Sequence, residues 1–161
     1  MGNKIYDDIN KKNDKALEYF LTSGKIKFLD EIENWEEGIR IAGEILVDNN
    51  SIKESYIDEM IQSVKQNGSY MVIAGQIALP HARLNESVIK TDMSLLCLKK
   101  PVIFPGNKNV KMIIPFASVN QVEHIEALSE LVTLVEDYNL LKFVENIDDI
   151  NEIIDFIKKN K

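Results

Sequence analysis

Apolar residues change their spacing twice along this chain, and these two changes limit the fold more than any other feature. Helical spacing runs from Trp35 to Val64. From Tyr70 to Pro115 the apolar residues instead form short β-rich runs that prolines separate. Helical spacing returns after Asn120 and continues almost to the last residue. Helices, then strands, then helices predict an α/β domain in which helices cover a mixed sheet, with the strand order left open.

Local signals divide these regions into individual elements. Asn34 is a suitable helix N-cap, and Glu37 three residues later completes the pattern of a capping box. Residues 107–109 predict a turn. In chain order we expect a helical arm at 1–22, a strand at 25–29, helices at 35–47 and 57–64, β-rich runs at 70–74, 94–98, 102–104 and 110–115, and helices at 125–135, 140–144 and 150–157. The apolar stripe of the first helix after residue 120 consists of Ile125, Leu128, Val132 and Val135.

Length and composition indicate one folded domain over residues 1–161. Of these 161 residues, 45% are hydrophobic and 28% are charged, which is typical of a globular chain. The formal net charge of −7 argues against nucleic acid as a partner, because nucleic acid binds basic surfaces. No apolar run approaches the roughly 20 residues that span a bilayer. No secretory signal pattern is visible either, so we expect a cytoplasmic protein.

Few of the residue patterns that mark enzymes or metal sites are present. Cys97 is the single cysteine, which excludes an internal disulfide and a thiolate zinc site. Its apolar neighbours predict a buried, inert thiol. The sequence has no glycine-rich loop with a lysine for nucleotide phosphates, no dinucleotide fingerprint and no nucleophile elbow. We therefore expect no metal and no cofactor.

Two histidines remain as the residues with the clearest chemistry. His81 follows a proline at the end of an apolar run, and Arg83 lies two residues further on. His124 stands at the start of a helix, where free backbone N–H groups favour anions. Ser118 and Asn120 join the same edge of the sheet if a strand ends at residue 117.

Together these groups supply a nucleophilic imidazole, a second imidazole, a cation and hydrogen-bond donors. Such a set is suited to accepting a phosphoryl group, since the protein then mainly positions the reactants and neutralises charge. Residue type and spacing alone leave a structural role open for each of His81, His124 and Arg83.

Four short motifs surround the two histidines. They are Gly68-Ser69-Tyr70, Ile77-Ala-Leu-Pro-His-Ala-Arg83, Lys90-Thr91 and His124-Ile125-Glu-Ala-Leu128. In order and spacing they resemble the enzyme IIA domains of the bacterial sugar phosphotransferase system, in the mannitol–fructose superfamily (EIIA type 2). Within it, the ascorbate-type IIA component is the most similar. The similarity extends from about Trp35 to the C-terminus. It implies a mixed β-sheet sandwiched between helices, in agreement with the element order.

The resemblance implies a phosphotransferase that relays a phosphoryl group through a phosphohistidine. In this family the carrier protein HPr donates to the histidine after the proline, which is His81 here. The group then passes to a cysteine of the cognate enzyme IIB, and the membrane enzyme IIC carries the sugar. His124 matches the family's second, assisting histidine, and Arg83 matches an arginine with a role in phosphate stabilisation. The step needs no metal or nucleotide, and similar proteins lead us to expect a homodimer.

Differences from the mannitol- and fructose-type members favour ascorbate or a related sugar. Those members carry a glutamate six residues before the active histidine, where this chain has Gly75, followed by Gln76. They commonly have glycine after the histidine, whereas this chain has Ala82-Arg83. Ser69 stands where the ascorbate-like branch commonly has proline. The alternative function is that of a regulatory IIA-like sensor that binds other proteins according to its phosphorylation state.

Overall fold

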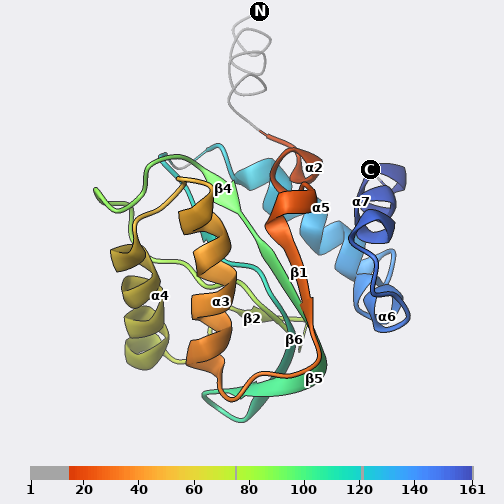
Figure 1. Ribbon diagram of the computed structural model, residues 1–161, viewed down its shortest axis with the longest axis horizontal. Coiled ribbons are helices and arrows are strands. Elements are labelled where there is room, and N and C mark those ends of the chain that lie inside the picture. Colours follow the sequence, from red (N-terminus) through yellow and green to blue (C-terminus); the bar gives the residue numbers. More distant parts are fainter. Residues whose placement is uncertain (1–14, 75, 121, 161) are drawn as a thin grey trace, which may run out of the picture.

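The computed structural model describes residues 15–74, 76–120 and 122–160. Within these residues a five-stranded sheet runs through the middle of the molecule in the order β1-β5-β6-β3-β2 (Figure 1). A separate two-stranded ribbon pairs β4 with β7. The strands are β1 (Ile26–Leu29), β2 (Val72–Ile73), β3 (Ile77–Ala78), β4 (Asp92–Met93), β5 (Leu95–Phe104), β6 (Lys108–Ile113) and β7 (Phe116–Ala117).

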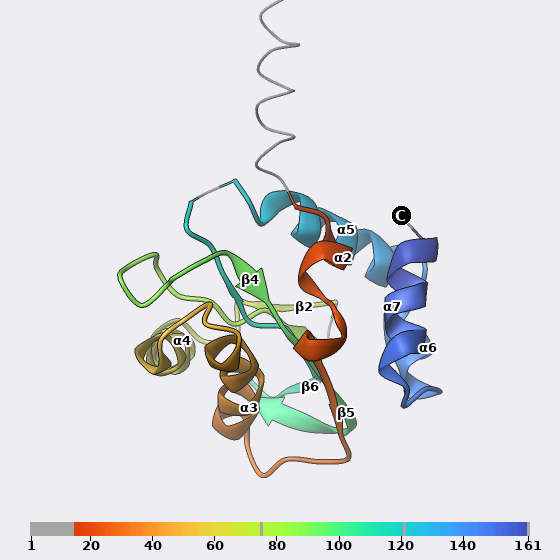
Figure 2. The same cartoon turned by 45° about the horizontal axis from the view of Figure 1, so that its top comes forward.

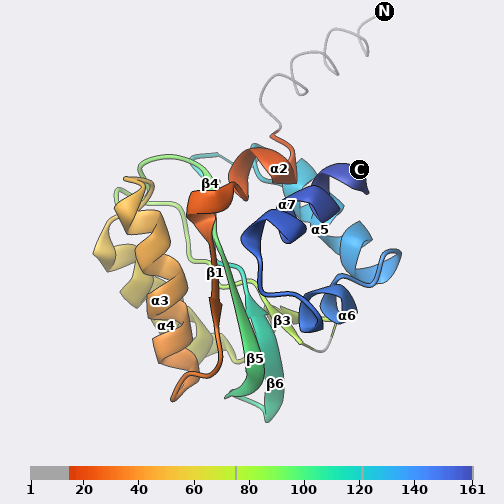
Figure 3. The same ribbon diagram turned by 45° about the vertical axis from the view of Figure 1, so that its right-hand side comes forward.

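Strand directions and flanking helices confirm the predicted α/β fold with a mixed sheet between helices. β1 is parallel to β5 and β3 is parallel to β6, whereas the β5–β6 and β2–β3 pairs are antiparallel. Two helices cover one face, and the remaining described helices cover the other (Figure 2 and Figure 3). The first face has α3 (Trp35–Asp48) and α4 (Glu54–Asn67); the second has α2 (Leu17–Phe20), α5 (Ile125–Glu136), α6 (Leu140–Glu145) and α7 (Ile150–Lys159).

Each face of the sheet has its own apolar core, which explains the continuous apolar run at the start of β5. Successive side chains point to opposite faces of a strand. Leu96 and Leu98 therefore pack in the core under α3 and α4, whereas Leu95 and Cys97 pack in the core under α2, α5 and α7. The predicted burial of the Cys97 thiol is confirmed. Burial raises the pKa of this thiol to about 12, so it stays protonated and unreactive at neutral pH.

The predicted capping signal at the start of α3 is present, with one change of partner. Asn34 Oδ1 accepts a hydrogen bond from the N–H of Glu37 at 2.8 Å. The Glu37 carboxylate accepts from the N–H of Glu33, one residue before the N-cap, at 2.9 Å. An N-cap of this kind stabilises a helix by about 1 kcal/mol. The start of α3 is therefore set by residues that are adjacent in the sequence.

The strand region differs from the prediction: the short strands β3, β4 and β7 were not predicted, and two further differences have a clear physical cause. The runs 94–98 and 102–104 belong to one strand, β5, which continues through Pro101. Its register against β6 shifts between Cys97 and Val102, and such an irregularity accommodates a proline that has no N–H for the ladder. The predicted turn at 107–109 lies two residues earlier, at 105–107. Gly106 and Asn107 adopt the positive φ values, 83° and 58°, that this tight connection requires.

The apolar stripe of α5 is rotated relative to the prediction. Ile125 and Val132 are exposed, at 53% and 37%, and do not face the sheet. The buried residues of α5 are Ala127, Leu131 and Leu134, with Leu128 and Val135 partly buried beside them. The stripe prediction was therefore wrong for Ile125 and Val132, because α5 is apolar on more than one face and only packing selects the buried one.

The predicted N-terminal arm, residues 1–22, lies partly outside the described residues. In its described part, Leu17 and Phe20 of α2 and the following Leu21 are buried in the core under α5 and α7. A 3-10 turn, η1 (Ser23–Lys25), then leads into β1, close to the predicted strand. From Leu17 onward this segment is part of the domain core.

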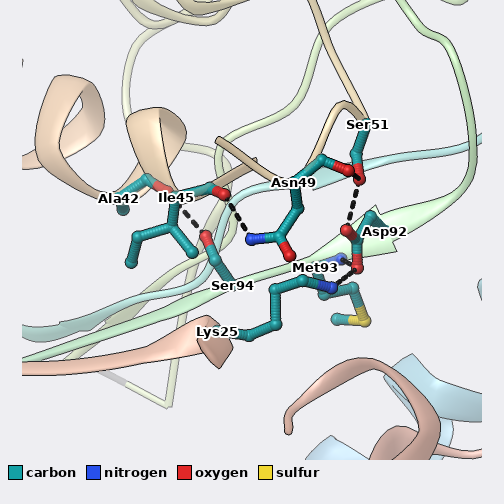
Figure 4. A network of polar contacts seen from close by, with 8 residues as sticks. All are labelled: Lys25, Ala42, Ile45, Asn49, Ser51, Asp92, Met93 and Ser94. Carbon is teal, nitrogen blue, oxygen red and sulfur yellow. Dashed lines mark hydrogen bonds and ion pairs between the residues drawn. The ribbon is translucent and has the colours of Figure 1, made fainter. Parts of the chain in front are cut away.

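A buried carboxylate joins three separate segments of the chain (Figure 4). Asp92 in β4 is only 2% exposed. Its carboxylate pairs with Lys25 Nζ at 2.6 Å and accepts a hydrogen bond from Ser51 Oγ at 2.5 Å. Lys25 precedes β1, and Ser51 lies between α3 and α4, so Asp92 fixes β4 relative to both. Because β4 pairs with β7, the same network also holds the strand that leads toward the second histidine.

Candidate active site

His81 lies in the loop that follows β3, where the backbone sets its protonation. Its Nδ1 is 2.8 Å from the carbonyl oxygen of Leu79. A carbonyl oxygen can only accept a hydrogen bond, so Nδ1 carries the proton and donates it. In the neutral ring Nε2 therefore holds the free lone pair and is the nucleophilic nitrogen.

Tyr70, in the turn between α4 and β2, lies against this nucleophilic nitrogen. Its hydroxyl oxygen is 3.4 Å from His81 Nε2. The two rings meet edge to face, with centroids 5.8 Å apart and an interplanar angle of 81°. Tyr70 is 56% exposed, so its phenol forms an outer wall of the site.

Phe116 connects the two histidines, which are 43 residues apart in the sequence. The His81 ring stacks on Phe116 with centroids 4.7 Å apart and an interplanar angle of 24°. The His124 ring also stacks on Phe116, at 5.3 Å and 21°. The loop of His81 is held to the same residue through its backbone, since the Phe116 N–H donates to the Pro80 carbonyl at 3.1 Å. His81 and His124 therefore lie close together, with an aromatic ring in contact with both.

His124 occupies the N-cap position of α5, but its side chain does not cap the helix. Its Nδ1 is buried and has no hydrogen-bond partner among the described residues. Burial lowers the pKa of His124 below its usual 6.5, and the neighbouring His81 lowers this pKa further. His124 is therefore neutral at pH 7. A nearby anion or hydrogen-bond donor would stabilise its unpartnered ring nitrogen.

Side-chain hydrogen bonds fix the loop that carries His124. Asn120 Oδ1 accepts from the N–H of Val122 at 2.8 Å and from the N–H of Glu123 at 2.9 Å. Thr91 Oγ1 donates to the Glu123 carboxylate at 2.5 Å and accepts from the N–H of Val119 at 3.0 Å. Ser118 Oγ hydrogen-bonds the Asn120 carbonyl. Ser118 and Asn120, which we expected as site residues, therefore shape this loop.

Tyr56, in α4, connects two backbone segments of the site through its hydroxyl. Its hydroxyl donates to the Phe116 carbonyl at 2.9 Å and accepts from the N–H of Ala82 at 3.0 Å. One buried phenol, 1% exposed, therefore ties the residue after His81 to the residue that stacks on both histidines. Burial raises the pKa of Tyr56 to about 12, so the hydroxyl keeps its proton throughout the neutral range.

Arg83 lies apart from the two stacked histidines. It is exposed and lines a surface hollow of about 530 Å³ along α4. The hollow is lined by Glu59, Gln62, Ser63, Gln66, Asn67, Ala82, Arg83 and Asn85. Neither histidine is part of this lining. The guanidinium is nevertheless only two residues from His81 and is exposed to solvent, where it is accessible to an anion.

The arrangement presents one nucleophilic nitrogen at the surface with polar groups around it. A nitrogen with a free lone pair, with a second imidazole close by, suits the acceptance of a phosphoryl group. Among the described residues, no group of three or more His, Cys, Asp or Glu side chains is placed to hold a metal ion. In the same part of the chain, no helix is both long and apolar enough to cross a bilayer.

Sequence reasoning missed the aromatic residues of the site. Tyr70 lies in one of the four motifs around the histidines, but no sequence signal placed its hydroxyl beside His81. Phe116 follows Pro115 at the end of a β-rich run, a position typical of a strand residue in the core. Tyr56 sits on the apolar face of an amphipathic helix, where core packing is the usual explanation.

Comparison with known proteins finds a family whose members are similar to this chain. Residues 19–160 match the family described as "Phosphoenolpyruvate-dependent sugar phosphotransferase system, EIIA 2". The mannitol-specific cryptic phosphotransferase enzyme IIA component of Escherichia coli K12 is 32% identical over 146 residues, covering 90% of this chain and 99% of that protein. The ascorbate-specific EIIA component of the same organism is 33% identical over 136 residues, covering 81% and 88%.

Solved structures agree with these sequence relatives. The solution structure of the E. coli mannitol-specific cryptic enzyme IIA superposes with a TM-score of 0.80 at 29% identity, covering 90% of this chain and 99% of that one. A complex of E. coli mannitol enzyme IIA with phosphorylated enzyme IIB has a TM-score of 0.73 at 23% identity, covering 86% and 96%. The second likeness shows the shared fold.

Proposed function

The chain belongs to the EIIA type 2 family of the sugar phosphotransferase system, and from this membership we propose that His81 carries the phosphoryl group. As a IIA component the protein is a phosphotransferase. The observation that supports His81 is the hydrogen bond from its Nδ1 to the Leu79 carbonyl, which leaves Nε2 as the free nucleophile. His81 is also partly exposed, so a protein partner can reach it.

The proposed donor is HPr phosphorylated on a histidine. The lone pair of His81 Nε2 attacks phosphorus, and the bond between phosphorus and the donor nitrogen breaks. The bonding electrons return to the donor imidazole, and the phosphoryl group ends on His81. The proton stays on Nδ1 throughout, hydrogen-bonded to the Leu79 carbonyl. In the phosphorylated state this proton makes His81 a good leaving group, which favours onward transfer.

His124 is proposed to assist at this step. Its ring shares Phe116 with His81 and is neutral before the reaction. A phosphoryl group on His81 brings negative charge, which raises the pKa of His124 and favours its protonated form. The resulting imidazolium stabilises the phosphorylated site. We expect His124→Ala to accept phosphate and to pass it on slowly.

Arg83 is proposed to stabilise phosphate from the rim of the site. Its guanidinium is exposed and only two residues from His81, and an arginine suits phosphate oxygens. We expect Arg83→Ala to lower the rate of acceptance or the lifetime of phosphohistidine. Unchanged values for both would remove Arg83 from the site.

The proposed acceptor is a cysteine of the cognate enzyme IIB, with the membrane enzyme IIC carrying the sugar. A structural neighbour is solved as a complex with phosphorylated enzyme IIB. With these partners, the proposed location of the chain is the cytoplasm. Ala82-Arg83 after the active histidine supports ascorbate or a related sugar. A homodimer that uses the N-terminal arm stays a prediction, since residues 1–14 of that arm lie outside the described residues.

Incubation with phosphoenolpyruvate, enzyme I and HPr tests the carrier function. We expect the wild-type protein to gain the mass of one phosphoryl group, and the gain to be lost in acid. His81→Ala should gain none, whereas the matched variant His124→Ala should still gain it. An unlabelled wild type would contradict the proposal, as would full labelling of His81→Ala. Offering the phosphorylated protein to ascorbate-type and mannitol-type IIB domains then tests the sugar: faster transfer to the ascorbate-type domain is expected.

A further inference from the structure

The phenol of Tyr70 lies beside His81 Nε2, the nitrogen that reacts, and the proposed transfer from HPr assigns it no role. The hydroxyl of Tyr70 is 3.4 Å from His81 Nε2, the nitrogen that the Leu79 hydrogen bond leaves unprotonated. An unprotonated nitrogen accepts, so the hydroxyl hydrogen is the group that points toward it. Before the reaction, therefore, a hydrogen-bond donor already faces the position that phosphorus will occupy.

The backbone on both sides of Tyr70 is anchored, although the side chain itself is exposed. Ser69 is buried, and its hydroxyl bonds the carbonyl of Pro105. Met71 is 4% exposed, and its carbonyl accepts a hydrogen bond from the N–H of Leu79 at 3.0 Å. Leu79 in turn accepts the hydrogen bond from His81 Nδ1. The phenol and the imidazole are thus attached to one hydrogen-bonded backbone unit, which fixes their relative position.

We propose that Tyr70 is a further catalytic residue, whose hydroxyl donates a hydrogen bond to the phosphoryl group as it reaches and leaves His81 Nε2. This inference rests on the proposed carrier function of His81. As the bond from Nε2 to phosphorus forms, the lone pair is used and the hydroxyl loses its acceptor. Rotation about the C–O bond of the phenol, with the ring in place, turns the hydroxyl hydrogen to one of the equatorial phosphoryl oxygens. No proton is transferred in this step.

The chemistry of the transferring group favours such a donor. Negative charge on the three equatorial oxygens is what an enzyme must stabilise in phosphoryl transfer. A donor that is already in place stabilises this charge without reorganisation. Removing one donor from a water-excluded site slows a reaction by about 100- to 1,000-fold, and because Tyr70 is exposed to water we expect about tenfold.

Tyr70→Phe tests this role, because it removes the hydroxyl and keeps the ring. Tyr138→Phe is the matched control, since Tyr138 is also exposed, at 46%, and lies just after α5, outside the site. The initial rate of phosphorylation is measured over a range of phospho-HPr concentrations for the wild type and both variants. We expect Tyr70→Phe to lower kcat about tenfold with KM for phospho-HPr unchanged, and Tyr138→Phe to match the wild type.

The outcomes separate this proposal from the carrier function. A Tyr70→Phe variant with the kcat of the wild type overturns the catalytic role of Tyr70 and leaves the carrier function intact. A raised KM with unchanged kcat also overturns it, because the hydroxyl then serves only for partner docking. A wild-type protein that accepts no phosphate overturns the carrier function itself. Urea unfolding curves that coincide for the wild type and Tyr70→Phe show that the lower kcat is not a folding defect.

Discussion

Tyr56→Phe isolates the hydrogen bonds that hold the two halves of the site together. The substitution keeps the ring in the core under α3 and α4 and removes only the hydroxyl. That hydroxyl donates to the Phe116 carbonyl at 2.9 Å and accepts from the Ala82 N–H at 3.0 Å. A buried hydrogen bond contributes about 1 kcal/mol net, so two lost bonds lower the free energy of unfolding by about 2 kcal/mol.

The loss is larger if water cannot reach the two backbone groups. An unpartnered buried group costs about 1–3 kcal/mol, so about 6 kcal/mol is the upper bound for the pair. Because Ala82 and Phe116 are only partly buried, we expect a value near the lower figure. Loss of the hydrogen bond to the Ala82 N–H should also slow phosphorylation of His81, since Ala82 directly follows His81.

Urea unfolding followed by tryptophan fluorescence measures this change. Trp35 is the single tryptophan, and it packs on Phe104 with ring centroids 5.8 Å apart, so its emission reports on the core that contains Tyr56. Tyr138→Phe serves as the control, with an expected change within about 0.5 kcal/mol. Equal unfolding midpoints for the two variants would refute the reasoning about Tyr56.

Two further predictions concern the histidine pair. The pKa of His124 is lowered in the folded protein below its usual 6.5, so its contribution to stability is fully present above about pH 6.5 and is lost as the pH falls through the folded pKa. Urea unfolding at several pH values should therefore show a weaker pH dependence in His124→Gln than in the wild type; parallel curves would count against the lowered pKa. Phe116→Leu removes the ring that stacks on both imidazoles, exposes His124 to water and should move its pKa back toward 6.5. An NMR titration of the His124 ring protons measures this, and an unchanged pKa would mean that Phe116 does not shield the ring.

Elements set by neighbouring residues were the ones that the sequence predicted. The start of α3 followed from Asn34 and Glu37, whose hydrogen bonds connect residues three or four apart. The fold class followed from the order of periodic segments. The passage of β5 through Pro101 was not predictable in this way, because it depends on a register shift against β6. The exposed side of Ile125 likewise depends on which face of α5 meets the sheet.

The site shows the same division between local and long-range information. The resemblance to a family singled out His81 and His124, and the structure places both rings on Phe116. The contact with Phe116 depends on the pairing of β4 with β7 and on a buried carboxylate at Asp92, neither of which has a local signature. The position of Tyr70 beside His81 depends on the hydrogen bond between Leu79 and Met71.

The ring nitrogen that carries phosphate provides the most direct test of the whole account. The protein is labelled with ¹⁵N in its histidine rings, phosphorylated by phosphoenolpyruvate, enzyme I and HPr, and studied by NMR at neutral or higher pH. We expect a phosphoryl group on Nε2 of His81, with Nδ1 still protonated and hydrogen-bonded to the Leu79 carbonyl. Phosphate on Nδ1 of His81, or on His124, would contradict it.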